Sequence, residues 1–286
     1  MLVWFYVNWD TARKLNGKIL NVLDQIIEGV REDLAERKKQ VELNELMAKI
    51  SEVNPAIDVL PSLQSSKLSV IAEVKRSSPS KGALAQISDP AELARSYQEG
   101  GATAVSVLTE GRKFGGSLAD LDAVRSAINI PILRKDFMVD DYQIFESRAH
   151  GADIVLLIVA ALSDLQLSEF YAISKSLGMQ VLVETHTLEE VERALLLDPE
   201  IIGVNARDLT TLKIDLDAFD RLAKAIPQGM VKVAESGISS LEDVISYRNS
   251  GAEAILVGEA LVKDGDPAQM IQNFINRADT PDISKV

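Results

Sequence analysis

The sequence contains no cysteine and only two histidines, which limits the kinds of catalytic and metal site that the chain can form. Without cysteine the chain forms no disulfide, no thiolate nucleophile and no zinc–thiolate site, which fits a reducing, cytoplasmic location. His186 lies two residues after Glu184, but no third ligand stands at a recognisable spacing, so we assign His186 a structural role and expect no metal. His150, just before Gly151, is interpreted as a helix-end residue. No serine stands in a Gly-x-Ser-x-Gly elbow, so serine hydrolysis is disfavoured.

Long hydrophobic runs and an excess of positive charge are also missing. The apolar opening, residues 1–7, is ended by Asn8, Trp9 and Asp10, well before the ~20 residues that a membrane span needs. The 43 acidic against 30 basic residues give a net charge of −13, which opposes attraction to nucleic acid or anionic lipid. We therefore expect neither nucleic acid nor a membrane as partner, and treat residues 1–17 as an atypical leader.

The chain does contain a regular alternation of short β-branched runs and helical stretches. This pattern is typical of a parallel sheet with crossover helices, and 286 residues suit one eight-stranded barrel, which takes about 250. A Gly-x-Gly-x-x-Gly fingerprint does not follow the first strand, which disfavours a doubly wound sheet. The prediction is an α/β fold, a (β/α)8 TIM barrel over residues 66–286, with strands at Ser69–Lys75, Ala104–Thr109, Pro131–Lys135, Asp153–Ile158, Gln180–Glu184, Ile201–Asn205, Val231–Glu235 and Ala254–Gly258.

A helical extension over residues 18–65 is expected before the barrel. Apolar residues recur at three- and four-residue steps from Ile19 to Leu34, as in an amphipathic helix. The charged residues Asp33, Glu36, Arg37, Lys38 and Lys39 are interpreted as its solvated face. Four of the expected barrel helices are Pro90–Glu99, Leu118–Ile128, Asp141–His150 and Leu241–Ser250.

Polar side chains end several of the predicted strands. Residues two apart in a strand share a face, so Glu73 and Lys75 point the same way, and Lys135 lies on the face of Leu133. If that face is the barrel interior, these groups lie at the C-terminal mouth, where barrel enzymes place catalytic groups. The alternative for the Glu73–Lys75 pair is an exposed ion pair at an edge.

Polar side chains also end the later strands. Glu184, Asn205, Arg207 and Glu235 stand at or just beyond equivalent strand ends, and this convergence indicates one site. Glycine turns follow the seventh and eighth strands, at Ser236-Gly237 and Gly258-Glu259, where many barrels bind phosphate through backbone N–H groups.

These motifs together resemble indole-3-glycerol phosphate synthase, from about Ile19 to the last helix. The resemblance rests on Ile71-Ala72-Glu73-Val74-Lys75-Arg76 with Ser78-Pro79, Thr109-Glu110-Gly111-Arg112-Lys113-Phe114, Leu133-Arg134-Lys135-Asp136-Phe137, Leu182-Val183-Glu184, Gly203-Val204-Asn205-Ala206-Arg207-Asp208-Leu209, Ala234-Glu235-Ser236-Gly237-Ile238 and Leu256-Val257-Gly258. It implies ring closure of 1-(o-carboxyphenylamino)-1-deoxyribulose 5-phosphate, a phosphorylated anionic substrate, with loss of carbon dioxide and water and without a cofactor.

The resemblance also implies residue roles. Lys135 matches the acid for the ketone oxygen, and Glu184 with the Glu73–Lys75 pair matches the residues of the later proton transfers; the division among them stays open. The remaining matches are Asn205 and Ser236 among the catalytic residues, Ser78, Pro79, Phe114, Phe137, Arg207, Leu209 and Glu235 for substrate binding, and Gly237, Gly258 and Glu259 for phosphate.

Three expectations accompany these roles. Glu259 departs from the small polar residue of some family members, so its carboxylate should turn away from the phosphate and only its backbone should contribute. Two lysines in one mouth should lower the pKa of at least one. The assembly is expected to be a monomer or a weak homo-oligomer.

Two rival interpretations stay open on the sequence. One is a Schiff-base aldolase, because a strand-end lysine such as Lys135 can also be a nucleophile. The other is a non-catalytic barrel that only binds a phosphorylated ligand or a partner protein.

Overall fold

The computed structural model describes residues 14–15, 18–84, 87–263 and 265–278. Eight parallel strands close into a barrel in which each strand pairs with the next one along the chain, and the last pairs with the first. The strands are β3 (Ser69–Val74), β6 (Ala104–Leu108), β7 (Ile132–Lys135), β8 (Ile154–Ile158), β9 (Gln180–Thr185), β10 (Ile201–Asn205), β11 (Val231–Glu235) and β12 (Ala254–Val257). The predicted TIM barrel is confirmed, and each strand bound lies within one residue of its prediction.

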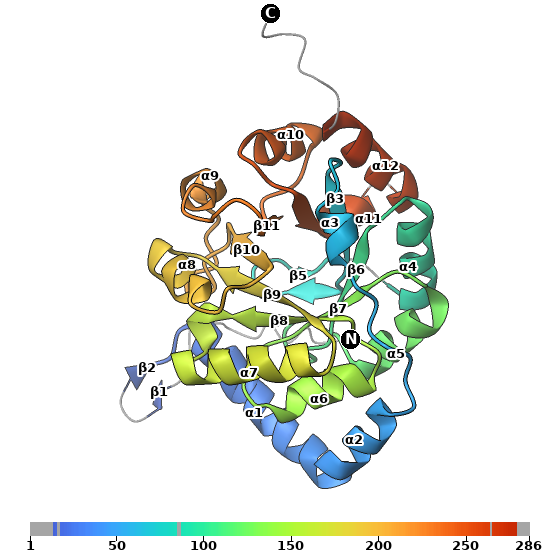
Figure 1. The fold of residues 1–286 in the computed structure, drawn as a ribbon, viewed down its shortest axis with the longest axis vertical. Helices are drawn as coiled ribbons and strands as arrows, with labels where there is room; N and C mark the ends of the chain where they lie inside the picture. Colours follow the sequence, from blue (N-terminus) through green and yellow to red (C-terminus); the bar gives the residue numbers. More distant parts are fainter. Residues whose placement is uncertain (1–13, 16–17, 85–86, 264, 279–286) are drawn as a thin grey trace, which may run out of the picture.

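Helices surround the barrel (Figure 1). They are α4 (Pro90–Glu99), α5 (Leu118–Ala127), α6 (Tyr142–Ala149), α7 (Asp164–Ser176), α8 (Leu188–Leu195), α9 (Ala218–Ala223), α10 (Leu241–Asn249), α11 (Glu259–Lys263) and α12 (Pro267–Ala278). The chain leaves α6 and α10 through Gly151 and Gly251, whose φ angles of 81° and 95° are left-handed and therefore suit glycine. His150 is the C-cap of α6, as the sequence predicts.

Alternation along each strand divides the core into two. In β3, Val70, Ala72 and Val74 pack outward against the helices, whereas Ile71 joins an interior cluster with Leu133 of β7. Because side chains alternate between the two faces of a strand, Glu73 lies on the same face as Ile71. The interior face therefore ends in polar groups at the C-terminal mouth of the barrel.

The extension consists of α1 (Val22–Gln40), α2 (Leu43–Ile50) and α3 (Leu60–Leu63). Asn21 begins α1 through a capping box with Asp24: the backbone N–H of Asp24 donates to the Asn21 side chain at 2.8 Å, and that of Asn21 donates back at 3.2 Å. The predicted start at Ile19 is wrong, because Ile19 lies in the two-residue strand β2 (Lys18–Ile19). Apart from residues 14–15, the predicted leader, residues 1–17, lies outside the described residues.

The interpretation of the charged residues on α1 as a solvated face is wrong for Asp33, Arg37 and Lys38, which pair with residues of the barrel. Asp33 accepts hydrogen bonds of 2.8 and 2.6 Å from Arg112, in the loop after β6. Arg37 donates two hydrogen bonds, of 2.7 and 3.1 Å, to the buried carboxylate of Glu146 in α6, and Lys38 donates to Asp140 at 2.6 Å. Figure 1 shows α1 and α2, in blue, on the side of the molecule where α6 lies. These contacts therefore attach the extension to the barrel, whereas Glu36 and Lys39 pair with each other on the exposed surface of α1.

Candidate active site

One pocket at the C-terminal mouth of the barrel is lined by every site residue that the sequence predicts. These are Glu73, Lys75, Ser78, Pro79, Phe114, Lys135, Phe137, Glu184, Asn205, Arg207, Leu209, Glu235, Ser236, Gly237, Gly258 and Glu259. They come from separate strand ends and the loops that follow them, and Ile26 of α1 adds an apolar contribution from the extension. The structure thus brings the predicted residues together, while the role of each one stays a prediction.

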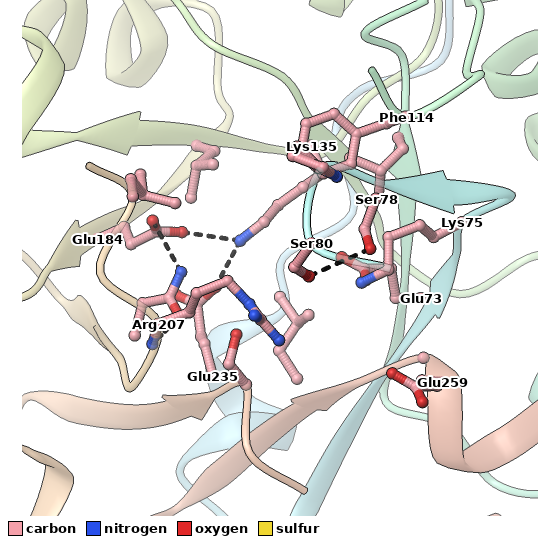
Figure 2. A pocket seen from close by; sticks show the side chains of 18 of the residues that line it. Glu73, Lys75, Ser78, Ser80, Phe114, Lys135, Glu184, Arg207, Glu235 and Glu259 are labelled. Atoms are coloured by element: carbon pink, nitrogen blue, oxygen red, sulfur yellow. Dashed lines mark hydrogen bonds and ion pairs between the residues drawn. The ribbon is translucent and has the colours of Figure 1, made fainter. Parts of the chain in front are cut away.

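The first strand presents an ion pair between Glu73 and Lys75, and Glu73 is buried while Lys75 is partly exposed. The pair points into the pocket (Figure 2), so the alternative of an exposed ion pair at an edge is excluded. A partly exposed ammonium beside a buried carboxylate offers the site a cation that substrate can reach.

Lys135 occupies the centre of the charged groups. Its Nζ donates a hydrogen bond of 2.8 Å to Glu184 and another to Glu235, so one ammonium bridges β9 and β11 across the mouth (Figure 2). Burial alone would lower the pKa of Lys135, but Glu184, Glu235 and Glu73 together outweigh burial and raise it. The expectation that lysine crowding lowers a pKa is therefore wrong for Lys135, because carboxylates, and not Lys75, are its immediate neighbours.

Glu184 and Glu235 share this lysine but differ in their other neighbours. Burial would raise the pKa of Glu184, yet Lys135 and His186 outweigh it and hold that pKa well below its usual range. The amide of Asn205 also donates to Glu184 at 3.1 Å. For Glu235, burial is the largest effect and the Glu184 charge adds to it, so the pKa rises to about 8 despite Lys135. One carboxylate is thus stabilised as an anion and the other as an acid.

His186 contacts Glu184, although the sequence analysis assigned His186 only a structural role. Its Nε2 is 3.3 Å from a Glu184 oxygen, and its Nδ1 is 3.0 Å from Glu190 of α8. Burial would lower the pKa of His186, but its contacts with these two carboxylates outweigh burial and raise it to about 10. The two-residue spacing of Glu184 and His186 on one strand face was the available signal.

The two glycine turns expected to bind phosphate flank the same pocket. Ser236 and Gly237 both adopt left-handed backbone conformations, with φ of 65° and 74°. At Gly258, an added Cβ would lie 3.1 Å from the Cβ and carbonyl oxygen of Glu73, so glycine lets the end of β12 pass close to β3. Residues of both turns line the pocket.

The Glu259 carboxylate accepts hydrogen bonds of 2.6 and 2.8 Å from Lys81 and forms an ion pair with Lys263 at 3.1 Å. Burial alone would raise its pKa, but these two lysines outweigh burial and lower it. The contacts neutralise a charge that would repel a phosphate; that only the backbone of Glu259 serves the ligand stays a prediction. Lys81 was missed, because its partner Glu259 lies 178 residues later in the chain.

An apolar and aromatic side of the pocket faces these charges. The rings of Phe114 and Phe137 lie 5.9 Å apart between centroids, and Pro79 and Leu209 complete the wall. The guanidinium of Arg207 donates to the Leu212 carbonyl at 3.1 Å, which fixes its position at the rim. The pocket is therefore suited to a flat ring that carries anionic groups.

Sequence reasoning also missed Asp136 and several apolar lining residues. The carboxylate of Asp136 accepts from Thr109 at 2.5 Å and from Arg134 at 3.1 Å, although Asp136 also lines the pocket. The remaining apolar lining residues are Leu84, Leu108, Leu156, Ile158, Leu212, Ile238, Leu256 and Val257. Their strand alternation could have indicated those that lie on strands.

Comparison with known proteins decides the family. The family model described as indole-3-glycerol phosphate synthase matches residues 23–274. The chain belongs to the indole-3-glycerol phosphate synthase family. Relatives with that name are 52% identical over 264 residues in Mycobacterium ulcerans, covering 92% of this chain and 97% of the relative, and, as synthase 1, 53% identical over 262 residues in Streptomyces coelicolor, with the same coverage. The resemblance drawn from the sequence is confirmed, and the chain is an enzyme of tryptophan biosynthesis.

Solved structures outside the family share the fold. A thiamine phosphate pyrophosphorylase from Pyrococcus furiosus aligns with a TM-score of 0.56 at 16% identity, covering 74% of this chain and 95% of that one. An N-acetylmannosamine-6-phosphate 2-epimerase from Clostridium perfringens aligns with a TM-score of 0.55 at 15% identity, covering 78% and 98%. Within the described ranges, every helix is too short or too polar to cross a bilayer.

Proposed function

We propose that the mouth pocket closes the indole ring of 1-(o-carboxyphenylamino)-1-deoxyribulose 5-phosphate, releasing carbon dioxide and water. The observation that carries this proposal is the ammonium of Lys135, held between two buried carboxylates beside an aromatic wall. In ring closure the aromatic carbon bearing the carboxylate attacks the ketone carbon, and negative charge develops on the ketone oxygen. We assign to Lys135 the protonation of that oxygen, which converts it to a hydroxyl.

The later steps need a second set of proton transfers. Breakage of the bond to the carboxylate releases carbon dioxide, and its electron pair restores the aromatic ring. Dehydration then removes a proton from the carbon beside nitrogen and expels the new hydroxyl as water, so it needs a base and an acid. We assign these transfers to Glu184 and the Glu73–Lys75 pair, with Asn205 orienting the substrate.

Charge complementarity supports the same substrate despite the net charge of −13. Local cations govern the field inside a cleft, and Lys75, Lys135 and Arg207 all line this one. We place the phosphate at the backbone of Gly237 and Gly258 and the aromatic ring against the wall that Phe114 and Phe137 form. Ser78, Ser236 and Glu235 are proposed as further contacts.

The aldolase interpretation is weaker, because a Schiff-base nucleophile must be a neutral amine. Lys135 contacts two carboxylates that raise its pKa, and this favours the ammonium form. Borohydride trapping with a keto-phosphate tests this alternative: a covalent adduct at Lys135 would favour the aldolase.

The cell compartment and assembly are part of the proposal. We propose a cytoplasmic enzyme, which acts as a monomer or a weak homo-oligomer on a small phosphorylated substrate, without a cofactor and without nucleic acid or a membrane as partner. The charge and the cysteine-free composition support this choice.

The direct experiment supplies the carboxyphenylamino substrate to purified protein, without added metal or cofactor, and follows indole fluorescence. We expect product from the wild type and a fall in kcat of roughly 10²–10⁴-fold or more for Lys135→Met, as for loss of a general acid. Lys113→Met, a lysine in a barrel loop whose side chain does not line the pocket, is the control and should keep near-normal turnover. Absence of product from the wild type, or near-normal turnover of Lys135→Met, would contradict the assignment.

A further inference from the structure

Two carboxylates compete for one proton at the centre of the site. Glu184 and Glu235 each accept a hydrogen bond from Lys135, and both are almost fully buried, at 1% and 2% exposure. Two carboxylates that share one ammonium in a dry site do not both ionise easily, so the proton must favour one of them. Which one it favours depends on their remaining neighbours.

The remaining neighbours of Glu184 all stabilise an anion. Lys135 approaches it from β7, the amide of Asn205 from β10, and the imidazole of His186 from the residue that follows β9. His186 in turn contacts Glu190, whose oxygen also accepts from the His186 backbone N–H at 2.8 Å. An imidazole between two carboxylates is held in its doubly protonated, cationic form.

Glu235 has no comparable support. Its second oxygen is buried and lacks a hydrogen-bond partner among the described residues, and it lies against Gly203, where an added Cβ would come within 2.2 Å. Apart from Lys135, the charges near Glu235 are negative: Glu184 and, on the other side of Lys135, Glu73 of β3. Of the two carboxylates, Glu235 is therefore the one that is protonated more easily.

We propose that His186 is a positioning residue that keeps Glu184 as the anion and leaves the proton of the Glu184–Glu235 pair on Glu235. This inference rests on the proposed function and deepens it, because it divides the pair into a base and an acid. His186 does not line the substrate pocket, so it acts only through Glu184. The contact at 3.3 Å does not make an aligned hydrogen bond, and its influence is mainly that of a buried positive charge.

The first test uses the resting protein and needs no turnover. Only two histidines occur in the chain, so ring-labelled histidine gives two sets of NMR signals, and His150→Gln assigns them by loss of one set. We expect His186 to stay cationic to above about pH 9 in the wild type. In Glu184→Gln the midpoint of the His186 titration should fall by at least about one pH unit, and in Glu235→Gln it should fall by less. A wild-type midpoint between about pH 6 and 7, near the ordinary histidine value, would overturn the inference.

The second test compares His186→Gln with His150→Gln, which removes a histidine paired with Asp122 on the outside of the barrel at 2.7 Å. Without the His186 charge, part of the proton moves to Glu184, so kcat should fall by about tenfold with little change in KM. Loss of a cation also makes the pair hold its proton more tightly, so the alkaline limb of the kcat profile should move up by about one pH unit.

The control, His150→Gln, should change neither kcat nor the profile. A purely structural role for His186 would lower stability or kcat without moving the alkaline limb, and that result would overturn the inference. If wild-type protein forms no indole product, the proposed function fails, whereas the NMR titration still decides whether His186 holds its charge against Glu184.

Discussion

Gly203 shows how one missing methyl group makes room for a catalytic arrangement. It lies on the inner face of β10, and an added Cβ would meet a Glu235 oxygen at 2.2 Å and Leu182 at 3.1 Å. Because Glu235 is buried and bound to Lys135, it cannot move aside without leaving that ammonium. Gly203→Ala should therefore displace Glu235 and lower kcat by about tenfold or more, since misplacing a catalytic group by about 1 Å costs roughly 10²-fold.

The matched control is Gly111→Ala, because the nearest atom to its added Cβ, the Gly116 carbonyl oxygen, is at an ordinary 3.6 Å. Steady-state kinetics and thermal unfolding of both variants check the prediction. An unchanged kcat in Gly203→Ala would contradict this prediction. It would mean that Glu235 can be displaced without loss of activity, so that its contact with Lys135 is dispensable.

Single residues also mark the limit of what sequence could predict. Strand alternation placed Glu73, Lys135 and Glu184 on the inner face without any knowledge of the closed barrel. The direction of the Lys135 pKa shift could not be predicted, because it depends on Glu235, 100 residues away, and on side-chain reach across the mouth. For the same reason the Lys81 contact with Glu259, 178 residues apart, was out of reach.

At the scale of elements, the extension is held to the barrel by charge as well as by apolar packing. Arg37 of α1 pairs with Glu146 of α6, which Arg134 of β7 also contacts at 2.9 Å. Burial would raise the pKa of Glu146, but Arg134 and Arg37 outweigh burial and lower it. A carboxyl group whose pKa is lowered by folding stabilises the folded state above its unfolded pKa, and that stabilisation is lost as pH falls.

Arg37→Ala should therefore lower the free energy of unfolding by about 1 kcal/mol near neutral pH, a modest figure because Arg37 is part-exposed. The difference from wild type should shrink as pH falls below about 4.3, the ordinary value for glutamate. Lys39→Ala is the control, because its pair with Glu36 is exposed and should change stability by less than about 0.5 kcal/mol. Urea unfolding across pH measures both, and a pH-independent loss would contradict the ion-pair explanation.

The bounds of the barrel strands were predictable, whereas attachments between elements were not. Hydrophobic periodicity and β-branched runs depend on neighbours in sequence, and they located β10 and β11 to the residue. The charged face of α1 was interpreted as solvated because two of its partners, Glu146 in α6 and Asp140 just before that helix, lie about 100 residues later in the chain. The sequence does not give the orientation of α6 relative to α1.

At the scale of the whole molecule, the division into an extension, residues 18–65, and a barrel, residues 66–286, stays a prediction. The interior packing argues for one cooperative unit. Leu23, Ile26, Val30 and Leu34 of α1 belong to the same buried cluster as the barrel-interior Leu133. Burial of such side chains contributes about 1.5–3 kcal/mol each, so α1 does not leave the barrel without loss of much of this energy.

We expect the extension and the barrel to unfold in a single transition. The cysteine-free chain allows one fluorophore to be attached at Arg31→Cys, an exposed position on α1, without competing labelling. Urea unfolding followed by this fluorophore should coincide with unfolding followed by far-ultraviolet circular dichroism, because coincident probes are the mark of a two-state transition. An identical label at Glu242→Cys, on α10, is the control for the barrel, since it reports unfolding from a helix outside the extension. A transition at Arg31→Cys that precedes the other two would mean that α1 detaches from a folded barrel, and that the pocket loses its Ile26 wall while the charged groups stay in place.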